Sequence, residues 1–486
     1  MLKSENLIPL MGGAYQARST IADYEICENL FPEINPQTTD APTPVTNFQR
    51  EGKRPLSDPP VLGPGRGLFT LSNGALISVV GNAVYWVDNN WLHNYVGTIG
   101  NLSTPVSISD NGTTAVIVDG SPNGWTMPLS TKIVEPLVDG TGTFVGATRV
   151  DFCDTFLAFN APGTNGWYTS LNNEVSFSAL MQANKDSNPD PIVTLAFNIR
   201  QPWLIGTKST EIWYNAGATP FAYNEWPNVF IPYGIAAPYS LTRADISLFW
   251  LSQNEQGQAL AVQTKGYGVQ AISTRALEYE WTNYPTVADC IAGSFQQGGH
   301  TFVVFHFPSA DKSWAYDLST QQWHRRTWVD HNGVAHREKV AFYASVGVSG
   351  GYPKTVVGQD WSTGSLYALD PQFYTDAGSP IVCRRTFPHI LKDMNEITHV
   401  SFVADFETGA GTDDNSTPVL CMRYSNDGGN KWSPYREKPL PPGAYRRIMR
   451  WRGLGMARDR VYELMWSFPG PSALQGAYVD PIEHGS

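Results

Sequence analysis

HTFVVFHFPSADKSWAYDLSTQQWHRRTW, residues 300–328, contains three short runs rich in aromatic and β-branched residues. The runs cover residues 301–307, 313–318 and 322–328, and turn-forming residues separate them at 308–311 and 319–321. Aromatic and β-branched side chains favour a pleated sheet, and polar turn residues stand where the alternation stops. The stretch therefore predicts one antiparallel sheet of three or four short strands.

Similar groups of short strands recur along most of the chain. Tight turns such as Asn-Gly and Gly-Asn join their strands. The groups cover residues 67–96, 106–137, 147–180, 192–226, 239–274, 301–328 and 340–369. Sheets of about four strands that recur every ~35–45 residues are typical of a β-propeller, in which neighbouring sheets cover each other's apolar faces. We predict an all-β chain with a propeller of seven blades by count, or six if a terminal group is partial; two unrelated sandwiches are the alternative.

The two ends of the chain differ from this pattern. Residues 1–62 are rich in proline and predict an irregular N-terminal arm. Its apolar residues Tyr24, Leu30 and Phe31 are expected to pack either on the same chain or on a neighbouring subunit. After residue 376 longer strands return, so we assign the propeller to residues 63–376 and a C-terminal β-sandwich-like domain to residues 377–486.

Charge is distributed unevenly in this acidic chain, whose formal net charge is −11. An acidic protein is a poor candidate for gripping nucleic acid, although it can line a path along which DNA slides. Six arginines are concentrated in the C-terminal domain: Arg446, Arg447, Arg450, Arg452, Arg458 and Arg460. They form either a solvated strand face or an interface with acidic subunits or a DNA backbone.

No motif predicts a catalytic, cofactor or metal site. The five cysteines are far apart and form no CxxC pair, and no apolar run reaches the ~20 residues of a membrane span. Ser425, Asp427, Gly429 and Trp432 fit the Asp-box pattern S-x-D-x-G-x-x-W, which predicts a stiff structural turn. Glu278 and Glu280 are expected to share a strand face, which makes them a weak candidate for paired carboxylates.

Several segments, in order, resemble one family of phage proteins. They are YQARS (15–19), CENLFPEINP (27–36), TEIWYNAGATPFAY (210–223), GIAAPYSL (234–241), QAISTRALE (270–278), WAYDLSTQQWHRR (314–326), MRYSNDGGNKWSPYREKPL (422–440) and RRIMRWRGLGMARDR (446–460). The chain is similar to the tail-hub or nozzle proteins of short-tailed phages, also called packaged-DNA stabilisation proteins. The likeness covers nearly the whole chain.

The resemblance implies a structural protein of the virion tail, made in the host cytoplasm, that is not an enzyme. It implies a ring of about six copies below the portal and its adaptor. The ring extends the DNA channel, retains the packaged genome, conducts it during ejection and contacts tail spikes, fibres or a needle. Double-stranded DNA would pass through its lumen without sequence-specific binding. Two alternatives stay open: a carbohydrate-active, sialidase-like or depolymerase-like propeller enzyme of a phage tail, and a cellular protein-interaction propeller.

Overall fold

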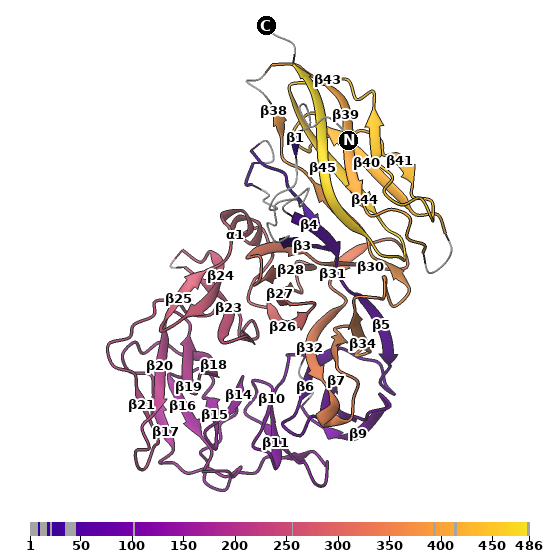
Figure 1. The fold of residues 1–486 in the computed structure, drawn as a ribbon. Coiled ribbons are helices and arrows are strands. Elements are labelled where there is room, and N and C mark those ends of the chain that lie inside the picture. The colour runs from indigo at the N-terminus through magenta and orange to yellow at the C-terminus, as the bar shows by residue number, and fades with distance from the viewer. Residues whose placement is uncertain are drawn as a thin grey trace.

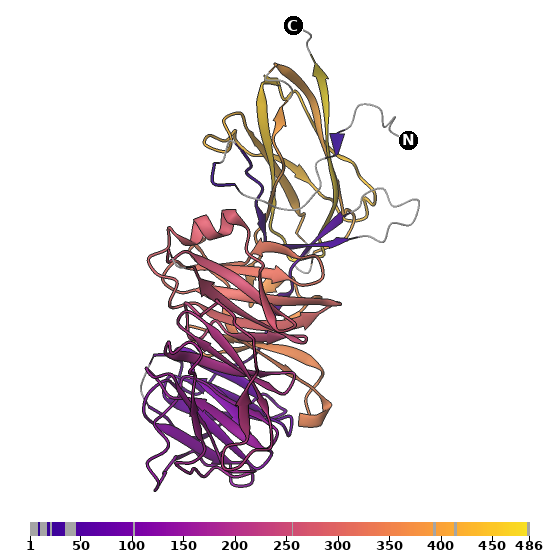
Figure 2. The ribbon, with the colours of Figure 1, turned by 90° about the vertical axis from the view of Figure 1, so that its left-hand side faces the viewer.

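The computed structural model describes residues 8–9, 17–19, 22–34, 45–100, 103–254, 256–391, 395–412 and 416–483. Figure 1 shows a ring of small sheets and, beside it, a domain of longer strands that carries the C-terminal part of the chain. In Figure 2 the ring is seen from its side, and the second domain continues from its rim. The all-β prediction is confirmed: apart from the helix α1 (Arg275–Trp281) and a 3-10 turn (Val348–Gly350), the regular elements of the described residues are strands.

Seven blades of four antiparallel strands each form the ring, which is the higher of the two predicted numbers; the sixth and seventh blades are parts of larger sheets. The first three blades are β6 (Gly65–Thr70), β7 (Leu76–Val80), β8 (Ala83–Val87) and β9 (His93–Thr98); β10 (Ser107–Asp110), β11 (Thr114–Val118), β12 (Gly124–Pro128) and β13 (Glu135–Pro136); and β14 (Val150–Cys153), β15 (Phe156–Asn160), β16 (Gly166–Thr169) and β17 (Gln182–Asn184). The next three are β18 (Ile192–Asn198), β19 (Gln201–Gly206), β20 (Thr210–Asn215) and β21 (Tyr223–Glu225); β22 (Thr242–Ala244), β23 (Ser247–Gln253), β24 (Ala259–Lys265) and β25 (Gly268–Ala271); and β26 (Ile291–Gln297), β27 (His300–Phe307), β28 (Lys312–Asp317) and β29 (Gln322–Arg325).

The sixth blade shows why these sequences form a ring. All eight residues of β27 are buried. Val303, Phe305 and Phe307 pack toward the fifth blade, whereas Phe302 and Val304 pack toward the seventh. Successive side chains of a strand point to opposite faces, so a strand that is buried at every position needs a neighbour on each side. A closed ring of sheets gives each blade both neighbours.

The seventh blade takes its fourth strand from the N-terminal segment. It consists of β32 (Val340–Val346), β33 (Thr355–Asp360), β34 (Leu366–Asp370) and β5 (Gly52–Ser57), and β5 runs antiparallel to β34. The segment assigned from sequence to the arm therefore contributes the strand that closes the ring. Pro55 lies within β5, opposite Tyr367.

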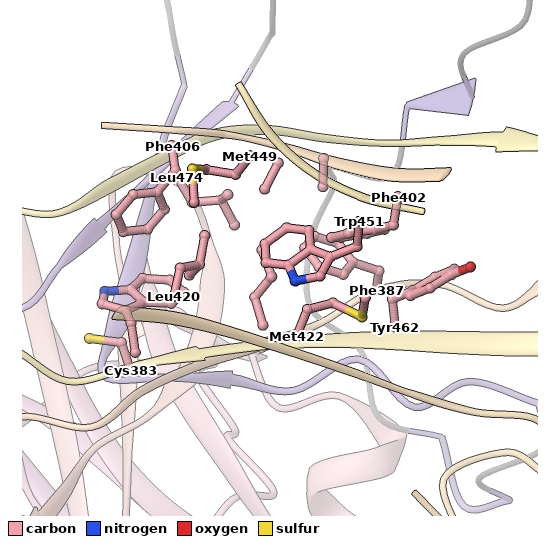
Figure 3. Close-up of a cluster of buried hydrophobic side chains, with 14 of the residues drawn as sticks. Cys383, Phe387, Phe402, Phe406, Leu420, Met422, Met449, Trp451, Tyr462 and Leu474 are labelled. Atoms are coloured by element: carbon pink, nitrogen blue, oxygen red, sulfur yellow. The ribbon is translucent and has the colours of Figure 1, made fainter. Parts of the chain in front are cut away.

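The C-terminal domain is a sandwich of two sheets. One sheet has the order β3 (Leu30–Ile34), β4 (Val45–Gln49), β45 (Ala473–Glu483), β39 (Ile397–Phe406) and β42 (Met449–Arg452), with β1 (Ile8–Pro9) paired to β45 and β43 (Met456–Ala457) to β39. The other contains β37 (Cys383–Thr386), β44 (Asp459–Trp466), β40 (Val419–Ser425) and β41 (Arg436–Pro439), with β38 (Ile390–Leu391) paired to β44. Figure 3 shows large side chains of both sheets meeting between them, among them Phe402 and Trp451 from one sheet and Leu420, Met422 and Tyr462 from the other.

A single short strand joins the sandwich to the ring. Glu28 of β2 (Cys27–Glu28) lies opposite Arg325 of β29 on one side and Arg384 of β37 on the other. The sheet of the sixth blade therefore continues through β2 into the sandwich. The small strands β30 (Thr327–Val329) and β31 (Ala335–Arg337) lie in the chain between the sixth and seventh blades, and β35 (Thr375–Asp376) and β36 (Ser379–Pro380) lie between the seventh blade and the sandwich.

Candidate assembly site

The apolar residues of the arm pack on their own chain. Leu30 is 0% exposed and belongs to the sandwich core. Phe31 lies against the sixth blade, with its ring centroid 5.0 Å from that of His300 and 5.5 Å from that of Phe302. Tyr24 contacts Trp432 at a centroid distance of 6.0 Å. All three residues thus have contacts within their own chain, and a contact with a neighbouring subunit stays a prediction.

A buried network of charged side chains reinforces this joint. Arg50, just before β5, uses all five of its N–H donors: Nε bonds Asn29 Oδ1 at 2.8 Å, Nη1 bonds the Glu51 carbonyl at 2.8 Å and Asp376 Oδ1 at 3.0 Å, and Nη2 bonds the Thr327 carbonyl at 2.8 Å and Asp376 Oδ2 at 2.5 Å. A guanidinium whose five donors are all satisfied is held in one geometry. Arg50 thus fixes the arm, β30 and β35 relative to one another.

The rest of the network links the same arm to the sixth and seventh blades. Arg326 binds both carboxylate oxygens of Glu51, at 2.7 and 2.8 Å, and reaches Glu338 at 3.5 Å. Lys53 pairs with Glu338 and, at 3.0 Å, with Asp376. Together with Arg50, the network contains three cations and three carboxylates.

This balance keeps the buried carboxylate of Glu338 ionised. Burial by itself would raise the pKa of Glu338, but Lys53, Arg50 and Arg326 hold that pKa well below its ordinary value. A buried ion network is costly to open one partner at a time, because each removal leaves an uncompensated charge. The joint between ring and sandwich is therefore a rigid connection.

The arginines predicted as an interface fall into two groups. Arg446, Arg447, Arg452 and Arg458 are exposed, and Arg450 is half-buried. Arg460 is 1% exposed and turns into the sandwich, where it donates to the Leu454 carbonyl at 2.7 Å and to Asn426 Oδ1 at 2.7 Å. Arg460 supports the sandwich from within and presents no surface to a partner.

Four cations line a cleft at the open edge of the sandwich. The strands β41 and β42 end their respective sheets, and a cavity of about 480 Å³ between them is lined by Arg436, Glu437, Lys438, Arg450, Trp451 and Arg452. Side chains bridge the two strands: Arg436 Nη1 bonds the Arg452 carbonyl at 3.2 Å, and the Trp451 indole N–H bonds the Arg436 carbonyl at 2.9 Å. The sequence analysis missed Arg436 and Lys438, whose only signal was the short basic strand REKP.

The adjoining loop, residues 441–448, extends this charged surface. Its tip is Tyr445-Arg446-Arg447-Ile448, and Tyr445 and Ile448 are 74% and 54% exposed. Arg446 has a φ of +57°, a conformation that non-glycine residues rarely adopt. We call Arg436, Lys438, Arg446, Arg447, Arg450 and Arg452 the basic edge.

The basic edge contrasts with the rest of the chain. Residues 1–376 contain 20 Lys and Arg against 32 Asp and Glu, a net charge of −12, whereas residues 377–486 contain 13 against 12, a net charge of +1. Within the described residues, no side chain of the basic edge forms an ion pair within 4 Å. The acidic surplus of the molecule therefore lies outside the C-terminal domain.

The Asp-box residues form a hydrogen-bonded turn. Ser425 Oγ bonds Asp427 Oδ1 at 2.8 Å and accepts from the Gly429 N–H at 2.9 Å, and the Trp432 indole donates to the Gly429 carbonyl at 2.9 Å. Gly429 has a φ of +89°, and Tyr24 of the arm packs against this turn. The geometry gives these residues a structural part, as attachment for the arm.

The central channel of the ring is lined by few charged side chains among the described residues. The first strands of the blades enclose a cavity of about 670 Å³, and of the described residues that line it the charged ones are Arg149, Asp151 and Arg243. Asp151 is already paired with Arg243 at 3.0 Å. A glycosidase needs two carboxyl groups flanking the scissile bond, and the lining supplies one.

Glu278 and Glu280 do not provide the second carboxylate. The expectation of a shared strand face is wrong, because both residues lie on α1, whose first turn is capped by the Thr274 side chain. Glu278 bonds Ser273 and Arg275, and Glu280 bonds Tyr284 and Arg325. These bonds hold the helix on the fifth and sixth blades.

The described part of the chain holds no group of three or more His, Cys, Asp or Glu that could bind a metal ion, and its five cysteines are free thiols. Among the same residues, no helix is both long and apolar enough to cross a membrane.

Solved structures with a similar course of the chain have low sequence identity to it. The N-terminal domain of Nup159 matches 71% of this chain and 98% of its own, with 10% identity and a TM-score of 0.42. The WD40 β-propeller domain of Doa1 matches 65% of this chain and 97% of its own, with 10% identity and a TM-score of 0.40. No curated protein matches the sequence. A family model does match the sequence, over residues 6–373, which is about three quarters of the chain. The matched range includes the arm, all seven blades and the charged network before Asp376. The protein belongs to the phage stabilisation family described as bacteriophage P22 Gp10, β-propeller.

Proposed function

We propose that this protein, a phage structural protein of the packaged-DNA stabilisation family, forms a ring of about six copies in the virion tail. In this proposal the ring lies below the portal and its adaptor, extends the DNA channel, retains the packaged genome and conducts it during ejection. Spikes, fibres or a needle attach to the same ring. The N-terminal arm and the sandwich form its platform against the adaptor, and the propellers lie around the outside.

The rigid joint is the observation that carries the proposal. An enzyme or a flexible adaptor does not require its two domains to be fixed by a shared sheet and a buried network of three cations and three carboxylates. A wall that withstands the pressure of packaged DNA does, because movement at the joint would open the channel. The acidic surplus of residues 1–376 supports the same proposal, since an acidic wall repels the DNA backbone.

Heads filled in the absence of this protein provide the test. We expect such heads to lose DNA to nuclease, and purified protein to restore retention together with a ring of density below the portal in electron micrographs. Acidic side chains are expected to face the lumen of that ring. Heads that keep their DNA equally well without the protein, or a ring with a basic lumen, would refute the proposal.

The carbohydrate-active alternative predicts a different result. It requires the purified protein to depolymerise host surface polysaccharide. We expect no release of reducing ends, because the channel lining offers one carboxylate that is already ion-paired.

A further inference from the structure

We infer that the basic edge and the tip of its loop form the surface by which one copy of the protein binds the acidic propeller of the next copy. The inference rests on the proposed ring and assigns one of its two contact surfaces. It differs from a contact with DNA or with another tail protein, and both of those are outcomes of the test below.

The cations of the basic edge have no carboxylate partner within 4 Å among the described residues; Arg436 and Lys438 instead lie over the rings of Tyr424 and Trp451. Six cations lie on two adjacent edge strands and the loop that follows the first, with Glu437 as the one carboxylate lining the cleft between those strands. Like charges held this close repel one another, and an acidic surface placed against them removes that repulsion. Elsewhere in the chain arginines are paired: Arg54, Arg200 and Arg243 each bind an aspartate of their own or a neighbouring blade.

The loop is built for contact with a folded surface. The Gly443 N–H bonds the Gly409 carbonyl at 3.0 Å, and the Arg447 N–H bonds Thr408 Oγ1 at 2.9 Å, so both ends of the loop tip are held. Tyr445 lies over Gly409, where a Cβ would come within 2.6 Å of its ring. A held loop loses little conformational freedom on binding.

The composition of the loop tip favours a protein partner over DNA. Tyr and Arg are the residue types enriched at the centres of protein interfaces, and Ile448 adds exposed apolar area beside them. DNA binding depends chiefly on phosphate neutralisation, to which an exposed isoleucine contributes nothing. The net charge of −12 on residues 1–376 also opposes the approach of a DNA duplex to the molecule.

A second copy supplies the complementary charge. Copies in a closed ring make heterologous contacts, in which one surface meets a different surface of the neighbour. The chain carries both signs in separate parts: the basic edge in residues 436–452 and the acidic surplus in residues 1–376. The acidic part of one copy can therefore supply the negative charge that would pair with the basic edge of its neighbour.

Charge reversal distinguishes this contact from its alternatives. The test variant is Arg447→Glu, Arg450→Glu and Arg452→Glu together, and its matched control is Lys354→Glu, Lys431→Glu and Arg458→Glu, three exposed cations outside the basic edge with the same change in net charge. Each variant is first checked for an unchanged unfolding midpoint, and then added to filled heads alone or mixed with the natural protein.

The mixture is the decisive arm of the experiment. The reversed variant keeps its acidic face, so it binds one neighbour but cannot bind the other and interrupts the ring. Alone it is expected to give no rings. In an equal mixture, only about one six-copy ring in 64 would lack the variant, so completed tails fall far below one half. The control variant forms rings at the natural yield.

Three results would overturn the inference. If the reversed variant formed normal rings but those rings lost DNA, the basic edge would be a contact with DNA. Normal rings that lack a spike or adaptor would assign it to another tail protein. If the control variant lowered the yield of completed rings to the same extent, the loss would be due to net charge and not to the basic edge. In each of these cases rings of the natural protein still test the proposed function separately, through retention of DNA.

Discussion

Replacing Arg50 with methionine tests whether the buried network holds the joint. The change keeps a long side chain but removes the five hydrogen bonds of the guanidinium. Asp376 would keep Lys53 as its single cation, and the carbonyls of Glu51 and Thr327 would lose a donor. Breaking a buried ion pair from one side typically costs about 3–5 kcal/mol, and we expect Arg50→Met to lower the free energy of unfolding by that amount.

Arg54→Met is the matched control. Arg54 lies four residues further along the chain, in β5, and its side chain is 53% exposed and pairs with Asp370 at 3.3 Å. Surface pairs contribute less than about 1 kcal/mol, so the control should change stability little. The measurement is urea unfolding followed by tryptophan fluorescence, with the transitions of ring and sandwich fitted separately.

A double variant sharpens the result. Arg50→Met with Asp376→Leu leaves Lys53 with Glu338 and Arg326 with Glu51, so the remaining charges balance again. We expect the double variant to be more stable than the sum of its single changes by about 1–3 kcal/mol. If Arg50→Met costs no more than Arg54→Met, or if the two single effects simply add, the network does not hold the joint and the reasoning fails.

Three further changes test other parts of the structure. His306 is buried, and its pKa is lowered to about 3, by burial first and by nearby Arg337 second. Below the unfolded pKa of about 6.5 the unfolded chain therefore binds more protons than the folded one, and the free energy of unfolding falls by about 2 kcal/mol between pH 6.5 and pH 5. His306→Gln should remove that part of the loss in urea titrations at both pH values. Gly429→Ala meets an aromatic ring of the arm at 3.1 Å and should lower the melting temperature more than Gly443→Ala, which shares its positive φ but has open space; equal shifts would exclude the contact. Gly52→Ala places a Cβ 1.9 Å from a backbone oxygen and should detach β5, seen as rapid hydrogen exchange in β34, whereas Gly268→Ala should not.

Much of the ring could be predicted from sequence, because each blade carries its own local pattern. The aromatic runs and polar turns of residues 300–328 form β27, β28 and β29 close to the predicted bounds. The strand β5 could not be found in this way. Pro55 suggested a segment without regular structure, yet β5 is the outer strand of its blade, and β35 on its far side pairs only with Lys53, so Pro55 takes no part in that outer pairing.

The candidate site could be predicted only in part from the sequence, for a similar reason. A row of arginines in sequence gives no side-chain direction, and the burial of Arg460 follows from packing in β44. The charged network joins residues about 275 to 326 positions apart, so no local pattern contains it. Glu278 and Glu280 were assigned to a strand because the surrounding residues are strand-rich, whereas Thr274 and the run Arg-Ala-Leu-Glu favour a short helix.

The pairing of β5 with β34 and of β4 with β45 has a consequence for biosynthesis. The N-terminal strands leave the ribosome long before their partners: β5 pairs with β34 at residues 366–370, and β4 pairs with β45 at residues 473–483, so the ring can close before the sandwich is complete. Such long-range pairing slows folding. It also means that a chain broken off before β34 lacks a closed ring, and a chain broken off before β45 lacks a finished sandwich.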